Sequence, residues 1–287
     1  MNRYTVHAPQ HVPKVSLNTY VHRAFPLLTD SAIRNAFQAR DVKMNGMRCS
    51  KDQLIEPGAE VTVFTPCKMD IPIVCENEEI IALDKPAGVS CDADSYGSMT
   101  VQDWAVLNAK GSCQPRLCHR LDNATSGIVL LAKNEAVETA LLDMFAEHRI
   151  QKTYCCLVKG CPDQRKAKKT AWLYKDAKRA NVQIYDWEKL GAKQIITEYE
   201  VLQGGKVSLL KVRLHTGRTH QIRAHLAHLG YPLLGDDLYG DREFNKKWGN
   251  GKLMLRSVEL ELDADARIPI SSGLKLTVPI KIDQSIP

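Results

Sequence analysis

The feature that most restricts the possible folds of this chain is a series of short apolar segments, each bounded by turn residues. Their lengths are typical of β-strands, and only a few helical patterns lie between them. A regular alternation of strands and helices around a parallel sheet is therefore not expected, and the pattern predicts an α+β fold. The expected strands cover residues 71–75, 80–83, 128–132, 153–158, 195–202, 207–214, 253–262 and 274–282.

Two helix starts in this part of the chain are marked by residues that can cap a helix. Thr100 and Asp103 form a capping-box pattern ahead of a helix that would begin at Val101. Asn134 precedes apolar residues at helical spacing and can cap a second helix.

The first part of the chain, residues 15–65, has the pattern of a separate small α/β unit. A helical pattern over residues 30–40 is followed by two apolar segments. Tight turns are indicated by an Asn-Gly pair at 45–46 and a Pro-Gly pair at 57–58. The expected order is therefore helix, short strand, turn and strand.

The sequence has the features of a protein of the cytoplasm. Its longest apolar runs, such as residues 128–132, are much shorter than the roughly 20 residues that span a bilayer. The first residues lack the apolar core of a signal peptide, so no membrane association or secretion is expected. The nine cysteines are odd in number and include no Cys-x-x-Cys pair, which favours reduced thiols over disulfides or a zinc site.

Basic residues are concentrated between residues 159 and 179, where there are eight of them and only two acidic ones. The basic residues are Lys159, Arg165, Lys166, Lys168, Lys169, Lys175, Lys178 and Arg179. Trp172 and Tyr174 are interleaved with them, a combination that suits phosphate contacts together with base stacking. A solvated loop whose lysines only aid solubility is an equally good interpretation of this segment.

The stretch CHRLDNATSGIVLLAKN, residues 118–134, places a charged cluster directly before an apolar run. The residues after Asp122 can bond backbone amides, and Gly127 permits a sharp turn into the strand, so this carboxylate can be held rigidly. An Asp in such a turn can equally serve only as a turn residue. A protein-kinase catalytic loop is disfavoured, because Leu121 separates Arg120 from Asp122 and no Gly-rich loop precedes the stretch.

A second polar cluster lies in RLHTGRTHQIRAHLAHLGYPLLGDDLYGDR, from residue 213. A helix is predicted here, with Thr216 or Thr219 as its cap. Its buried stripe is expected to consist of Ile222, Leu226 and Leu229. Its other faces are expected to carry His220, Arg223 and His228. Arg218, at the entrance of the helix, can pair bidentately with a carboxylate or a phosphate.

Metal ligation by this second cluster is disfavoured. Its four histidines lack the His-Glu-x-x-His spacing, so hydrogen-bonded histidines are expected instead. Asp236, Asp237 and Asp241 could hold a hard cation, but a polar turn around Gly235 and Gly240 is the preferred interpretation.

Four segments in order resemble the motifs of the RluA-type pseudouridine synthases: IVCENEEIIALDKPAGV, CHRLDNATSGIVLLAKN, QKTYCCLVKG and LHTGRTHQIRAHLAHLGYPLLGDDLYG. The resemblance implies a catalytic domain over residues 71–285, with a mixed, largely antiparallel central sheet flanked by helices and loops. Members of this family isomerise uridines in RNA to pseudouridine. They break the bond from sugar to ring nitrogen, turn the uracil and rejoin it through carbon 5, without a metal or organic cofactor.

The resemblance also assigns roles to individual residues. Asp122 would be the essential aspartate, acting as a nucleophile toward the sugar or ring, or as a base at the ribose 2′ position. Arg218 would form the ion pair that holds Asp122 ionised, and Tyr154 would stack on the uracil and assist proton removal from carbon 5. Arg120 would occupy the space of the flipped base. The full substrate-binding set would be His119, Arg120, Lys152, Thr219, His220, Gln221, Arg223 and Leu255.

The chain departs from known patterns in two places. Arg256 and Ser257 follow Leu255 where the family usually has His-Ala. The N-terminal unit resembles the ribosomal-protein-S-four type RNA-binding module through ARDVKMNG and IEPGAEVTVF, but residues 21–23 read Val-His-Arg where that module usually has Arg-Leu-Asp. Residues 1–65 carry eight basic and five acidic residues, so RNA binding is expected, with a protein-interaction role as the alternative.

The sequence therefore predicts a cytoplasmic, monomeric RNA pseudouridine synthase that acts on ribosomal or transfer RNA. Two other classes of function stay open at this point. One is a non-catalytic RNA-binding or ribosome-assembly protein with the same fold, against which the presence of Asp122, Tyr154 and Arg218 counts. The other is a different enzyme acting on a glycosidic bond in RNA, such as a base-exchanging transferase.

Overall fold

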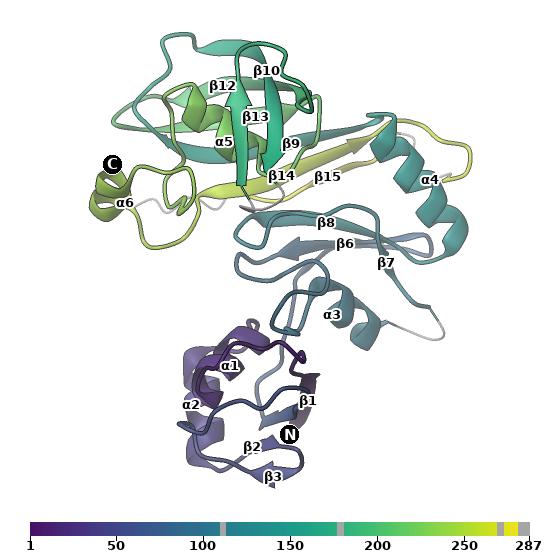
Figure 1. The fold of residues 1–287 in the computed structure, drawn as a ribbon. Helices are drawn as coiled ribbons and strands as arrows, with labels where there is room; N and C mark the ends of the chain where they lie inside the picture. Colours follow the sequence, from purple (N-terminus) through teal and green to yellow (C-terminus); the bar gives the residue numbers. More distant parts are fainter. Residues whose placement is uncertain (110–112, 177–180, 269–272, 281–287) are drawn as a thin grey trace. The chain divides into compact units, whose positions relative to one another are not determined.

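The computed structural model describes residues 1–109, 113–176, 181–268 and 273–280. They form two compact units, and each is described by itself (Figure 1). One unit joins Met1–Pro72 with Gly88–Pro115, and the other joins Ile73–Ala87 with Arg116–Pro287. Lys178, Arg179 and the last part of the expected strand at 274–282 lie outside the described residues.

The first unit contains an antiparallel sheet in the order β1-β4-β2-β3. Its elements are β1 (Asn2–His7), α1 (Leu17–Ala24), α2 (Asp30–Gln38), β2 (Val42–Met44), β3 (Met47–Arg48), β4 (Glu60–Thr65) and α3 (Val101–Asn108). Asn45 and Gly46 form the turn between β2 and β3, both with positive φ, as the Asn-Gly signal predicts. The helices predicted at 30–40 and from Val101 are confirmed. The unit also includes β1 and α3, which lie outside residues 15–65.

The first unit has an apolar core of its own. Tyr20 and Phe25 are fully buried in this core among aliphatic side chains from the helices and the sheet. Burying one such side chain stabilises a fold by about 1.5–3 kcal/mol. Ser16 and Thr29 cap α1 and α2, because each side chain accepts a hydrogen bond from the backbone N–H of the third helical residue. Core packing and capping together fix the two helices.

The second unit is built on a large mixed sheet in the order β11-β10-β12-β13-β9-β14-β8-β6-β5 (Figure 1). Neighbours along this path are antiparallel except for β14 and β8, which are parallel. The predicted mixed, largely antiparallel sheet is thus confirmed. Its strands are β5 (Ile73–Glu76), β6 (Ile80–Lys85), β7 (Arg116–Leu117), β8 (Ser126–Ala132), β9 (Ile150–Lys159), β10 (Lys166–Asp176), β11 (Asn181–Tyr185), β12 (Lys193–Gln203), β13 (Val207–Leu214), β14 (Leu255–Leu262) and β15 (Lys275–Thr277).

The described part of the basic segment at 159–179 is not a loop. It forms the end of β9 and strand β10, which pairs with β11 as an antiparallel hairpin. The side chains alternate along β10, since Ala171 and Leu173 are buried while Trp172 and Tyr174 are partly exposed. The loop interpretation is therefore wrong for these residues, because the many lysines conceal a period-two pattern.

Three helices of the second unit are α4 (Glu135–Ala146), α5 (Gln221–His228) and α6 (Arg242–Trp248). Asn134 caps α4 as predicted. The cap predicted for α5 at Thr216 or Thr219 is wrong, because His220 occupies the N-cap position with φ +54° and makes no side-chain cap bond. The position expected for Arg223 on an exposed face is also wrong, since α5 is buried on nearly all sides and Arg223 with it.

All nine cysteines are free thiols, as expected. Burial raises the pKa of Cys118 to about 12 and that of Cys155 to about 11, so these two thiols stay protonated at neutral pH. In the part of the chain that the structure describes, no helix has the length and apolar character that crossing a membrane requires.

Candidate active site

Asp122 lies in the loop between β7 and β8. Its backbone carbonyl accepts a hydrogen bond from the Thr125 N–H at 3.0 Å, which closes a turn. Gly127 then enters β8 with φ +113°, and a Cβ at this position would lie 2.0 Å from the Ser257 carbonyl oxygen on β14. Only glycine fits this close approach. The sharp turn predicted from Gly127 is confirmed, and it leaves the Asp122 side chain 28% exposed.

Lys85, the last residue of β6, secures the Asp122 loop. Its side chain is fully buried, and its Nζ donates hydrogen bonds to the carbonyl oxygens of Asn123 at 3.0 Å and of Pro86 at 3.1 Å. Asn123 directly follows Asp122, so the bond fixes the loop next to the carboxylate. The Lys-Pro-Ala-Gly stretch is typical of a turn, and this function of its lysine was missed from the sequence. The sequence signal that could have indicated this function is the position of a lysine directly before a Pro-x-Gly turn.

His119 connects the part of the loop that precedes Asp122 to β8. Its Nε2 accepts a hydrogen bond from the backbone N–H of Leu130 at 3.1 Å, and its ring lies 4.6 Å from the ring of Phe145, centroid to centroid. Burial, assisted by the charge of Lys152, lowers the pKa of His119 to about 3. The imidazole is therefore neutral at neutral pH with one nitrogen engaged, which suits positioning of the loop. A direct contact with substrate stays a prediction.

Arg223 is the arginine that pairs with Asp122. Its Nη1 lies 3.6 Å from Asp122 Oδ2, while Nε and Nη2 donate to the two oxygens of Asp236 at 2.7 and 2.8 Å. Burial alone would lower the pKa of Arg223, but the bonds and charges of these carboxylates outweigh burial and raise it. Asp236 is equally buried, and its bonds from Arg223 and from backbone N–H groups lower its pKa. The result is a charged network in which Arg223 links Asp122 to Asp236.

The ion pair expected between Arg218 and Asp122 is therefore replaced by the pair between Arg223 and Asp122. Arg218 is exposed and lies in the turn before α5, where its backbone N–H donates to Gln221 Oε1 at 3.1 Å. Burial, assisted by the charge of Arg218, lowers the pKa of Lys152. Within the described ranges, Asp122 forms an ion pair with Arg223, and the ring of His220 is its other close basic neighbour. Arg223 takes the predicted place of Arg218 because α5 directs its side chain inward.

His220 approaches Asp122 from the start of α5. Its Nε2 lies 3.8 Å from Asp122 Oδ2, and its Nδ1 lies 3.0 Å from the hydroxyl of Tyr239. The Tyr239 oxygen already accepts the backbone N–H of Val182 at 3.0 Å, so its own hydrogen can be donated to Nδ1. The remaining ring proton then sits on Nε2 and faces the carboxylate. Burial lowers the pKa of His220 against the opposing influence of Asp122, which favours this neutral form.

Tyr154 lies in the middle of β9, within the electrostatic influence of the Asp122 carboxylate. Its side chain is buried, and both burial and the Asp122 charge raise the pKa of its phenol. Tyr154 pairs with Ser257 on β14, and Leu255 pairs with Cys156 two residues further along β9. Paired residues share a face of the sheet, so Leu255 lies on the same face as Tyr154. A role of Leu255 in lining a uracil site with Asp122 and Tyr154 stays a prediction.

The other predicted site residues form two groups, one that is at least partly buried and one that is exposed. Gln221 is buried, and its side-chain amide bonds Thr197 and the backbone of Ile196 and Arg218, so it holds the turn before α5. Lys152 is two residues from Tyr154 on β9, with its Nζ 5.7 Å from the Phe145 ring centroid. The exposed group, which a large substrate can reach, consists of Arg120, Arg218 and Thr219.

Arg256, where the chain departs from the resembled pattern, has partners of its own. Its Nη2 lies 2.7 Å from Asp84 Oδ2 on β6, and both side chains are 11% exposed. Its Nε donates to the carbonyl oxygen of Pro279 at 3.1 Å. Arg256 alternates with Leu255 along β14, so it lies on the opposite face from the Asp122 site. The departure therefore leaves the surroundings of Leu255 unaffected.

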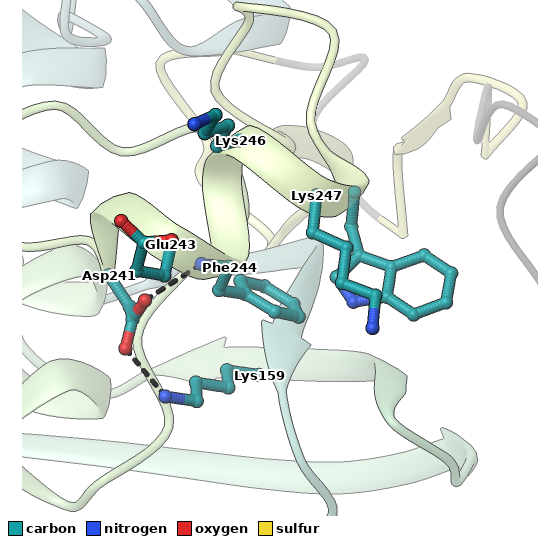
Figure 2. Close-up of a pocket in the computed structure, with 7 residues that line it drawn as sticks. Lys159, Asp241, Glu243, Phe244, Lys246 and Lys247 are labelled. Atoms are coloured by element: carbon teal, nitrogen blue, oxygen red, sulfur yellow. Dashed lines mark hydrogen bonds and ion pairs between the residues drawn. The ribbon is translucent and has the colours of Figure 1, made fainter.

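The remaining histidines and acidic residues of the second cluster are engaged in hydrogen bonds. His225 bonds Thr197, and His215 bonds Glu198. Asp236 accepts the N–H groups of Leu238 and Tyr239, which forms the polar turn predicted there. In a separate pocket of about 760 Å³, Asp241 accepts the backbone N–H of Phe244 and pairs with Lys159 (Figure 2). This pocket contains none of the predicted catalytic residues.

Known proteins match this chain over most of its length. Residues 79–228 match the family model described as RNA pseudouridylate synthase. The chain is 30% identical over 270 residues to "Ribosomal large subunit pseudouridine synthase D" of Borreliella burgdorferi, covering 86% of this chain and 82% of the relative. It is 32% identical over 247 residues to "Uncharacterized RNA pseudouridine synthase" of Aquifex aeolicus, covering 78% and 76%. Among solved structures, "Human RNA Pseudouridylate Synthase Domain Containing 1" has the same fold, with a TM-score of 0.62, 24% identity and coverage of 75% and 86%.

Proposed function

The chain belongs to the RNA pseudouridylate synthase family, and from this premise we propose that it isomerises uridines of structured ribosomal or transfer RNA by means of Asp122. One observation carries the proposal. The Asp122 carboxylate lies at ion-pair distance from Arg223 and His220 and beside the buried phenol of Tyr154. Ribosomal RNA as the substrate is supported by relatives named as ribosomal large subunit pseudouridine synthases.

The proposed chemistry is a rearrangement within one nucleotide. The bond between C1′ and N1 of the uracil breaks, a bond between C1′ and C5 forms, and the proton lost from C5 is balanced by one gained at N1. Asp122 would attack the sugar or the ring, or remove the 2′ proton, and each of these roles needs an ionised carboxylate. Arg223 favours that ionised form at 3.6 Å. The atoms balance inside the nucleotide, so the proposal involves no cofactor.

Tyr154 would take part in the last step of the reaction. Its raised pKa keeps the phenol protonated at neutral pH, so it cannot act as a free phenolate base. It can instead relay a proton, by passing its own proton toward Asp122 as it accepts the one from C5. Its ring is also a surface on which the turned uracil can stack.

The exposed arginines would bind the RNA around the target. Arg120 is exposed on the same loop as Asp122, two residues before it, so it can fill the space left by the flipped base. Arg218 is exposed at the turn before α5, where its guanidinium suits a phosphate. In this proposal Arg218 binds the RNA backbone, while Arg223 forms the ion pair with the Asp122 carboxylate.

Residues 15–65 are proposed to be an additional RNA-binding module of the ribosomal-protein-S-four type, and residues 71–285 the catalytic domain. The proposal is supported by the order of α1, α2 and the turn between β2 and β3 in the expected region. Arg34, Arg48 and Lys51 are exposed on this unit and can contact phosphates. We also propose that the protein acts as a monomer in the cytoplasm.

The proposed function is tested by release of tritium from RNA labelled at carbon 5 of uridine. The C5 proton leaves only when the rearrangement runs to completion, so the wild type is expected to release tritium from ribosomal or transfer RNA. Mapping pseudouridines in cells with and without the protein would then identify the modified positions. Absence of release from every cellular RNA would refute the isomerase.

Replacing Tyr239 by Phe is expected to lower kcat about fivefold while leaving KM unchanged. The change removes the hydroxyl that holds His220 Nδ1 at 3.0 Å, and one neutral hydrogen bond contributes about 1 kcal/mol. The ring proton of His220 is then no longer directed to Asp122, so the acidic limb of the kcat–pH profile should move as well. Tyr231→Phe is the matched control, and equal effects of the two variants would contradict the assigned role of Tyr239.

Replacing Lys166, Lys168 and Lys169 together by Ala is expected to weaken RNA binding and to flatten its dependence on salt. Lys166 and Lys168 are exposed on β10, and removing each lysine–phosphate interaction should reduce the slope of log K against log salt by about 0.7–0.9. The slope is measured by titrating RNA at several salt concentrations, with Lys206→Ala as the control for removal of a surface charge. An unchanged slope would mean that these lysines only aid solubility.

A further inference from the structure

Four aromatic side chains form a cluster on the β10–β11 hairpin, which we call the aromatic face: Trp172, Tyr174, Tyr185 and Trp187. Trp172 on β10 pairs directly with Tyr185 at the end of β11. The rings of Tyr185 and Trp187 meet edge to face, with their centroids 5.7 Å apart. Trp187 is 65% exposed, although a large aromatic side chain is normally buried. The cluster therefore presents ring surface to the solvent.

Lysines accompany these rings. The Nζ of Lys189 lies 3.9 Å from the ring centroid of Tyr185 and 5.1 Å from that of Tyr174. Lys168 lies four residues before Trp172 on the same side of β10, about 13 Å along the strand. Lys168 is exposed, and Glu198, directly opposite it on β12, is paired with His215 at 2.9 Å and with Lys166 at 3.9 Å. Positive charge is thus available on two sides of the ring cluster.

The aromatic face lies on the side of the sheet opposite to Tyr154. Strand pairing places Tyr154 opposite Val212, Val212 opposite Tyr199, and Tyr199 opposite Ala167. These residues share one face of the sheet, as does Ala171 on β10, whereas Trp172 points to the other face. The aromatic face therefore cannot hold the uridine that reacts at Asp122. If it binds nucleic acid, it binds a second region of the same molecule.

We propose that the aromatic face binds an unpaired stretch of the RNA substrate, with bases stacked on Trp172 and Trp187 and phosphates contacted by Lys168 and Lys189. Stacking on aromatic side chains accepts any base, because every base has a flat π-surface. The inference rests on the proposed function, which supplies RNA as the substrate. It deepens that function by adding a second contact that is specific for unpaired nucleotides.

The chemistry of the aromatic face favours unpaired RNA over an RNA duplex or a protein as its occupant. Bases in a duplex are already stacked on one another, so only their edges and the backbone are accessible to a protein. A protein partner is disfavoured, since protein–protein interfaces are depleted in lysine and Lys189 lies between two of the rings. A strand face that combines exposed rings with lysines matches the stacking surfaces of proteins that bind single strands.

Binding of the full-length protein to an oligocytidylate of about ten nucleotides tests the proposal, because this probe is unpaired and contains no uridine for the catalytic site. Fluorescence anisotropy would compare the wild type with Trp172→Ala and Trp187→Ala, and an RNA duplex of the same length serves as the second probe. Each Ala variant is expected to bind the oligocytidylate about tenfold more weakly and the duplex unchanged. Trp187→Phe should restore most of the binding, because it keeps a ring at this position.

Leu190→Ala is the matched control, since Leu190 is 97% exposed in the same loop and carries no ring. Equal affinity of the wild type and both Trp→Ala variants for the oligocytidylate would overturn the proposal. Equal affinity for duplex and oligocytidylate in the wild type would also overturn it, as would capture of a ribosomal protein in place of RNA. Tritium release by the wild type is measured in parallel. Release without ring-dependent binding would refute this inference alone, whereas ring-dependent binding without release would refute only the proposed function.

Discussion

Replacing Asp122 by Asn is expected to reduce tritium release from RNA by about 10⁴-fold or more, the loss that follows removal of an essential catalytic group. The amide has nearly the same shape as the carboxylate, but it is a poor nucleophile and a poor base. The Asp122 side chain is 28% exposed and its backbone turn does not depend on the carboxylate, so the variant should fold normally. RNA affinity should stay within about a factor of two of the wild type, because phosphate contacts dominate it.

Asp163→Asn is the matched control, because Asp163 is an exposed carboxylate that follows the end of β9 and is not one of the predicted site residues. It removes the same charge and should leave release unchanged. Release by Asp122→Asn at the wild-type rate would remove Asp122 from the mechanism altogether. Loss of RNA binding in the same variant would instead show that the carboxylate is needed to organise the surface that binds RNA.

Replacing Arg223 by Met is expected to lower the free energy of unfolding by about 3–5 kcal/mol and to abolish turnover. The change leaves the Asp236 carboxylate, whose side chain is fully buried, without its cation, and removal of one partner from a buried pair has this cost. Asp122 also loses the cation at 3.6 Å that favours its ionised form. Urea unfolding followed by circular dichroism measures the first effect, and tritium release the second.

The double variant Arg223→Met, Asp236→Asn separates these two effects. The second substitution removes the unpaired charge, while the amide oxygen can still accept the backbone N–H groups of Leu238 and Tyr239, so much of the stability should return. Turnover should stay abolished, because Asp122 is still without Arg223. Arg218→Met is the control for removal of an arginine and should change stability by less than about 0.5 kcal/mol, since Arg218 is exposed. If Arg218→Met abolished turnover while Arg223→Met did not, the pairing seen in the structure would not be the one that matters for activity.

The sheet of the second unit was predictable because its strands are short apolar segments between turn residues. β12 and β13, for example, begin and end within two residues of the predicted bounds. β10 and β11 were missed, because apolar residues such as Ala171 and Leu173 alternate there with lysines, tyrosines and tryptophans. A period-two pattern is recognised from the contrast in polarity between the two faces of a strand. Aromatic residues on the exposed face reduce that contrast.

Motifs were enough to propose Asp122 and Tyr154 as site residues, whereas they could not decide which of two arginines in one motif pairs with Asp122. Arg218 and Arg223 are five residues apart and equally able to pair with a carboxylate. The choice depends on which way α5 directs its side chains, and this follows from packing of the helix against the sheet. Lys85 and Tyr239 were missed for the same reason, since each acts through a partner that is distant in sequence.

The parallel pairing of β14 with β8 has a consequence for the order in which the protein can be made. β14 separates β9 from β8 in the sheet, so until it is present Tyr154 and the Asp122 loop belong to two unconnected groups of strands. Gly127, which enters β8 just after Asp122, packs against Ser257, a residue that the ribosome adds 130 positions later. Such distant contacts form late. The site is therefore assembled only after β14 has been synthesised. A nascent chain that ends before β14 contains both Tyr154 and the Asp122 loop, but it lacks the strand that joins them in one sheet.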